Sequence, residues 1–145
     1  AGIPIVGYET LLPRLVDSHL LSDHLSKKRI DFVINNAGFQ HAYDQSIVHC
    51  SRMVNSDRVL ENKVKLKNDK YLDLLRRRGI DFSPLIISSL GATSKQFDFF
   101  VHRVKQLARD NGISLNIRDL YSSLSCVLAS FAGSYFARAY YNVRL

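Results

Sequence analysis

Residues 28–44 read KRIDFVINNAGFQHAYD, and this stretch predicts two paired strands. Residues 30–34 (IDFVI) are typical of a strand. Residues 35–38 (NNAG) have turn chemistry, because Asn and Gly tolerate the backbone angles that tight turns require. Residues 39–49 predict a returning strand, so the whole stretch predicts a β-hairpin.

Helical patterns flank this hairpin on both sides. Upstream, a helix is predicted over residues 9–25, with Pro13 in an early turn. Its apolar spacing comes from Leu12, Leu15, Val16, Leu20 and Leu21. Downstream, Asn55 or Ser56 is expected to cap a helix that runs to Arg78, and Gly79 suits the residue after its end.

The second half of the chain predicts one more strand and further helices. Residues 83–90 (SPLIISSL) form an apolar run typical of a buried strand, and a helix is predicted over residues 95–110. A last helix, or pair of helices, carries an apolar stripe of Leu120, Leu124, Val127, Leu128, Phe131 and Tyr135. The predicted order is helix, hairpin, helix, strand, helix, helix, which indicates an α/β fold with a mixed sheet flanked by helices.

Length and composition limit the class of protein. The chain has 145 residues, of which 46% are apolar and 23% charged, as in one soluble globular domain. No run approaches the roughly 18 apolar residues of a membrane-spanning helix. Two cysteines, Cys50 and Cys126, form no disulfide framework and indicate a reducing compartment. Because the chain opens at Ala1 without a Met or signal peptide, we expect a single domain over residues 1–145, excised from a larger polyprotein.

Positive charge is concentrated in the middle of the chain. The formal net charge is +7. Residues 26–78 hold twelve Lys and Arg against six acids, a net +6, whereas residues 1–25 hold one Arg against three acids, a net −2. This balance predicts a polyanionic partner, nucleic acid first and a membrane surface second.

Two acidic residues lie on the predicted hairpin, Asp31 on one strand and Asp44 on the other. Pairing of the strands can bring the two carboxylates together, and like charges repel unless a cation lies between them. Mg²⁺ and Mn²⁺ are the cations that suit such oxygen ligands. The alternative is that each acid caps a strand end or pairs with Arg29 or a lysine.

The helix after the hairpin carries a lysine within its apolar stripe. At about 100° per residue, Lys67 falls about 20° from Leu60, between the apolar residues, while Lys63 and Lys70 lie at the edge of the stripe. A lysine there is costly unless its ammonium meets a carboxylate, a phosphate or water. Lys67 therefore either extends to solvent at the rim of the core or points at Asp31 and Asp44. Two acids and a lysine at one site are what metal-dependent phosphodiester hydrolysis requires.

An ordered set of motifs resembles a known family. Lys28-Arg29-Ile30-Asp31, twelve residues and then Asp44 resemble the (R/K)PD-x12–14-D motif of the restriction-enzyme-like endonuclease of non-LTR retrotransposons (LINE elements), a branch of the PD-(D/E)XK nucleases. Residues 67–71 (KNDKY) match the family's KxxKY element, and residues 79–91 resemble the strand and glycine that follow it. The resemblance covers roughly residues 25–135.

This resemblance implies a fold, a reaction and roles for single residues. The fold would be a restriction-endonuclease-like mixed sheet flanked by helices. Asp31 and Asp44 would bind Mg²⁺ or Mn²⁺, and Lys67 would be the catalytic lysine. The domain would nick DNA in the nucleus for target-primed reverse transcription by a neighbouring reverse transcriptase domain. The flanking basic residues are expected to hold the DNA backbone: Lys28, Arg29, Lys63, Lys70, Arg76, Arg77 and Arg78.

Departures from the family pattern keep several alternatives open. Ile30 stands where the family has proline, and the long spacing from Asp44 leaves Lys63, Lys67 and Lys70 as candidates for the catalytic lysine. Glu9 is a candidate further acid near the metal. Two rival functions are a non-catalytic, basic nucleic-acid-binding module on a degenerate nuclease fold, and a dimeric nuclease that resolves Holliday junctions. Target sequence, strand preference, metal preference, oligomeric state and the activity of the isolated domain stay open.

Overall fold

The computed structural model describes the backbone of residues 5–11, 14–16, 19, 21–50, 56–123, 126–127 and 130, and the side chains of the same residues from residue 14 onward. Its named elements, in chain order, are β1 (Ile5–Leu11), α1 (Asp23–Ser26), β2 (Arg29–Asn36), β3 (Phe39–Val48), α2 (Ser56–Arg76), β4 (Ile80–Ser88) and α3 (Lys95–Asp110).

The four named strands form one mixed sheet in the order β1-β2-β3-β4. β1 and β2 are antiparallel, and so are β2 and β3. β3 and β4 are parallel, with Gln40 opposite Ile80 at one end and Val48 opposite Ser88 at the other. Parallel neighbours require a crossover connection, and α2 supplies it.

The predicted hairpin of β2 and β3 is confirmed. Ala37 and Gly38 have φ angles of 51° and 84°. Positive φ at both central residues is the signature of the type I′ turn, whose twist matches that of the two strands. The amide N–H of Gly38 also donates to the side-chain oxygen of Asn35 at 3.1 Å, which stabilises the turn from within.

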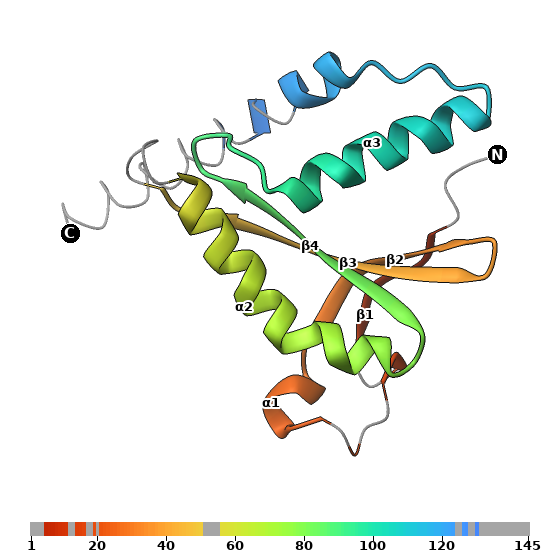
Figure 1. The fold of residues 1–145 in the computed structure, drawn as a ribbon, viewed down its shortest axis with the longest axis vertical. Coiled ribbons are helices and arrows are strands. Elements are labelled where there is room, and N and C mark those ends of the chain that lie inside the picture. Colours follow the sequence, from red (N-terminus) through yellow and green to blue (C-terminus); the bar gives the residue numbers. More distant parts are fainter. Residues whose placement is uncertain are drawn as a thin grey trace.

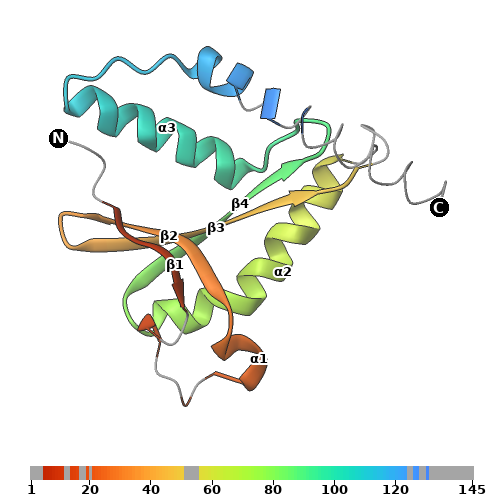
Figure 2. The same ribbon diagram turned by 180° about the vertical axis from the view of Figure 1, so that it is seen from behind.

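Helices cover both faces of the sheet, as Figures 1 and 2 show for α2 and α3. Alternate residues of β4 determine this arrangement, because successive side chains of a strand point to opposite faces. Phe82 packs in one buried cluster with Tyr71 and Leu75 of α2. Leu85 packs on the other face, with Phe97 and Phe100 of α3. The chain is therefore a mixed α/β protein with its sheet between helices.

One predicted helix is wrong. Residues 5–11 (IVGYETL) form β1 instead of leading into a helix over residues 9–25, and within that range the structure places a named helix only at α1. β-branched and aromatic residues favour a strand here, and pairing with β2 gives their backbone groups partners. The apolar spacing suggested a helix because Leu15, Val16 and Leu21 do pack into the core. They do so from irregular backbone rather than from a helix.

The other boundaries differ less. α2 ends at Arg76, two residues before the predicted end, and β4 begins at Ile80 rather than Ser83. α3 has the predicted bounds, with the hydroxyl of Ser94 accepting from the N–H of Phe97 at its start. Helical backbone follows at residues 117–123 and 126–127. Leu120 and Val127 of the predicted stripe are exposed, and its remaining members, Leu124, Leu128, Phe131 and Tyr135, lie outside the described residues.

Candidate functional site

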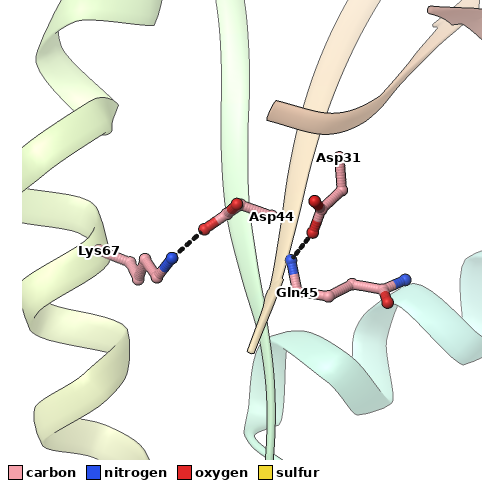
Figure 3. A network of polar contacts seen from close by, with 4 residues as sticks. All are labelled: Asp31, Asp44, Gln45 and Lys67. Carbon is pink, nitrogen blue, oxygen red and sulfur yellow. Dashed lines mark hydrogen bonds and ion pairs between the residues drawn. The ribbon is translucent and has the colours of Figure 1, made fainter. Parts of the chain in front are cut away.

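Asp44 and Lys67 meet between β3 and α2. Ala42 and Asp44 occupy alternate positions of β3 on the face that α2 covers, and Asp44 is 5% exposed. Lys67 lies one helical turn from both Val64 and Tyr71, which are buried against that face. Its ammonium donates to Oδ2 of Asp44 (Figure 3). Lys67 therefore satisfies its buried position with a carboxylate, one of the two outcomes that the sequence left open.

Asp31 reaches the same strand from β2. The hairpin register pairs Phe32 with Tyr43 as its last pair, so Asp31 and Asp44 are the first residues beyond the ladder. There Oδ2 of Asp31 accepts a hydrogen bond from the backbone N–H of Gln45 at 2.5 Å (Figure 3). The carboxylate replaces the missing strand partner of that N–H, and it stays next to Asp44.

The electrostatics of Asp44 reflect this crowding. Burial raises the pKa of its carboxyl group, Lys67 opposes the increase, and the negative charge of Asp31 adds to it. Burial outweighs the two lysines, Lys67 and Lys70, so the ionised form of Asp44 is disfavoured relative to a carboxylate in water. Such a site gains free energy from additional positive charge.

Tyr71 links the lysines to the carboxylates. Burial, followed by the charges of Asp44 and Asp31, raises its pKa to about 12. The ammonium groups of Lys67 and Lys70 lie 5.8 Å and 5.1 Å from the centre of its ring. The sequence identified Tyr71 only as an apolar residue of the stripe and a member of the KxxKY match; the signal for its position was its spacing of one helical turn from Lys67.

Lys28, Lys63 and Lys67 all lie within the electrostatic reach of Lys70. The pKa of Lys70 is lowered, first by burial and then by the positive charges of Lys28, Lys67 and Lys63, while Asp44 opposes the shift. Positive charges are therefore gathered around Lys70. Arg29 is exposed at the start of β2.

The three consecutive arginines, Arg76, Arg77 and Arg78, lie elsewhere. They are exposed at the end of α2 and in the turn before β4. Lys67 and Arg76 are nine residues apart on one helix, which corresponds to about 13 Å. Lys70 therefore lies within the electrostatic reach of Asp44, Lys28 and Lys63 lie within reach of Lys70, and the arginines lie at the end of α2 and in the turn after it.

The metal-binding capacity of the site rests on oxygen ligands. Among the residues with described side chains, no group of three or more His, Cys, Asp or Glu could hold a metal ion. Asp31 and Asp44 supply two carboxylates, which fits Mg²⁺, because that ion keeps several waters and is usually held by one or two carboxylates and substrate phosphate. Glu9 lies at the level of Asp31 on the neighbouring strand, between Tyr8 opposite Phe32 and Thr10 opposite Ile30.

A second polar cluster, which the sequence did not reveal, lies on the other face of the sheet. A ring nitrogen of His41 lies 2.8 Å from the hydroxyl of Ser83, and the ring stacks on Tyr43 at 4.4 Å between centroids. Burial and then the positive charge of Arg103 lower the pKa of His41, against the opposing charge of Asp81. Because Arg103 belongs to α3, this cluster joins that helix to β3 and β4.

A groove of about 740 Å³ lies on the other side of α2, away from the carboxylates. Residues of α2 and of the first turn of α3 line it, among them Glu61, Lys65 and Asp98, whereas Asp44 and Lys67 do not. The described groove therefore does not include the candidate site, which is a contact between β2, β3 and α2.

Comparisons with known proteins find no relatives. No family model matches the chain, and neither the curated proteins nor the solved structures contain a match. Within the part of the chain that the structure describes, no helix has the length and apolar character to cross a membrane.

Proposed function

We propose that this chain is a divalent-metal-dependent endonuclease domain with a restriction-endonuclease-like fold. It nicks target DNA in the nucleus so that a neighbouring reverse transcriptase domain can extend the free 3′ end. One observation carries this proposal: Lys67 of α2 contacts Asp44 of β3 beside Asp31 of β2. Three residues that are far apart in the sequence meet where the resemblance implies an active site.

Each residue of the site has a role in this proposal. Asp31 and Asp44 would hold Mg²⁺ or Mn²⁺, which lowers the pKa of a bound water and neutralises charge on the phosphate. Lys67 would stabilise the negative charge that develops on the phosphate during attack. Lys67 is favoured over Lys63 and Lys70 because the structure joins its ammonium directly to Asp44.

The surrounding charges suit a DNA backbone. Lys70 lies within the electrostatic reach of Asp44 and of Lys28 and Lys63, and a phosphate would relieve the repulsion among these lysines. Contacts of this kind position a duplex without reading its sequence, so binding should weaken steeply with salt.

Nicking of supercoiled plasmid tests the proposal. Wild type should convert plasmid to open circles with Mg²⁺ or Mn²⁺, and EDTA should stop the reaction. Asp44→Asn and Lys67→Met should be inactive. Lys65→Met removes an equal charge from the exposed side of α2 and should nick as wild type does. If Asp44→Asn, purified in the same way, nicks as fast as wild type, the proposal is wrong.

The rival to be distinguished is a binding module without catalysis. The contact between Asp44 and Lys67 would then be a structural ion pair. Wild type that shifts DNA in a gel, yet leaves plasmid intact with either metal, would establish that alternative.

A further inference from the structure

The tip of the β2–β3 hairpin exposes an aromatic ring. Phe39 is the first residue of β3 and is 77% exposed. A single exposed apolar residue is common and needs no explanation by itself. Phe39 differs from other exposed apolar residues in two ways. A tight turn fixes its position, and arginines lie at the same end of the sheet.

The hairpin presents Phe39 on a rigid base. The type I′ turn at Ala37 and Gly38 precedes it directly, and Asn36 pairs with it across the hairpin. Along β3 the same face carries His41 and then Tyr43, whose rings stack with an interplanar angle of 12°. The aromatic row thus runs from buried Tyr43, through half-buried His41, to exposed Phe39 at the tip.

Positively charged residues lie at the same end of the sheet as this ring, which is on the face that α3 covers. Gln40 pairs with Ile80, so the turn that carries Arg77 and Arg78 lies at the same end of the sheet as Phe39 (Figure 1). Arg76 ends α2 at this end, and all three arginines are exposed. From the other layer, Arg103 of α3 approaches the next aromatic residue of the row, His41.

We infer that Phe39 stacks on an unpaired base of single-stranded DNA, with Arg76, Arg77 and Arg78 binding the adjoining phosphates. An exposed aromatic ring beside a basic surface is the arrangement that binds single strands, because every base offers a face for stacking. Paired bases offer no such face unless the duplex is first unstacked, which costs free energy. The ligand is therefore an unpaired stretch of DNA, not a duplex.

This inference rests on the proposed function and extends it. Asp44 lies five positions after Phe39 on β3, which corresponds to about 17 Å along the strand. Phe39 would hold DNA several nucleotides from the cleavage site.

Fluorescence of Phe39→Trp provides the test. The chain contains no Trp, so this variant has a single indole. Oligothymidylate should quench its emission by stacking, whereas an abasic oligonucleotide of equal length, with the same phosphates, should not. The matched control is Phe99→Trp, because Phe99 of α3 is 73% exposed, and its emission should not respond to either ligand.

Binding of Phe39→Ala gives a second readout. Its affinity for oligothymidylate should fall roughly tenfold, with duplex affinity unchanged. Equal quenching of Phe39→Trp by the abasic strand, or unchanged affinity of Phe39→Ala, would overturn the inference. Plasmid nicking by the same preparations separates the two proposals. Quenching without nicking rejects the nuclease and keeps the single-strand site. Nicking without quenching keeps the nuclease and rejects the single-strand site.

Discussion

Replacing Lys67 with Met should change metal binding and cleavage in opposite directions. In the structure the ammonium of Lys67 donates to Oδ2 of Asp44, so it occupies a carboxylate that would bind the metal. A cation that binds there either displaces the lysine or lies beside its positive charge. In both cases Lys67 lowers the affinity of the site for metal, although it serves the proposed reaction.

The size of the effect follows from that contact. The side chains of Lys67 and Asp44 are 20% and 7% exposed, so solvent screens the pair only in part. A hydrogen bond between charged groups contributes about 1.5–3 kcal/mol. Since about 1.4 kcal/mol corresponds to tenfold in affinity, Lys67→Met should bind Mn²⁺ roughly 10- to 100-fold more tightly than wild type.

The Mn²⁺ affinity can be measured from the electron paramagnetic resonance signal of the free ion, at about pH 8, where carboxyl groups are ionised. Lys65→Met is the matched control, because Lys65 is exposed on the same helix and lines the groove on its other side. It removes the same charge and should change the affinity by less than about twofold, as expected for a screened surface charge.

Two results would refute this reasoning. One is Lys67→Met that binds Mn²⁺ no more tightly than Lys65→Met does. The other is Lys67→Met that binds more tightly and still nicks plasmid at the wild-type rate. If loss of the lysine destabilises the fold, added Mn²⁺ should raise the melting temperature of this variant more than that of wild type, because bound ligand stabilises the folded state.

Three further predictions concern stability. The pKa of Asp44 is raised, so its contribution to the free energy of unfolding is greatest below about pH 3.8 and is lost as the pH rises through its folded-state pKa. In urea titrations the stability of Asp44→Asn relative to wild type should therefore increase with pH. A difference that does not change with pH contradicts this prediction. The pKa of His41 is lowered, so wild type should lose stability as the pH falls below 6.5. His41→Gln should remove part of this loss. If the free energy of unfolding of His41→Gln depends on pH as that of wild type does, His41 is not the group responsible. Gly38→Val should lower the free energy of unfolding by about 1–2 kcal/mol, because φ is 84° there, and an unaltered denaturation midpoint would show that the turn relaxes.

Local signals were sufficient for much of the fold. The Asn-Asn-Ala-Gly turn and the helical stripe that ends near Gly79 act within a few residues, so the hairpin and α2 followed from the sequence, and α3 has its predicted bounds. β1 was missed because its residues gain their partners from β2, some twenty positions later, and the spacing of nearby leucines imitated a helix.

The candidate site also has a part that the sequence predicts and a part that depends on the tertiary structure. The position of Lys67 within the apolar stripe of α2 was enough to predict that its ammonium needs a partner, since a helix determines which residues share a face. That the partner is Asp44, and that Asp31 meets the N–H of Gln45, depends on where α2 crosses β3 and where the hairpin ladder stops. Neither is a local property of the chain.

Phe39 and the three arginines also combine a local feature of the sequence with a tertiary one, and they are further apart in the chain than Asp44 and Lys67 are. From the sequence alone it follows that Phe39 comes after a tight turn, and that Arg76, Arg77 and Arg78 come near the end of a predicted helix. Their position at one end of the sheet follows only from the tertiary structure. The physical reason is the parallel pairing of β3 with β4, which α2 makes possible by spanning the sheet and returning the chain to the level of the hairpin tip.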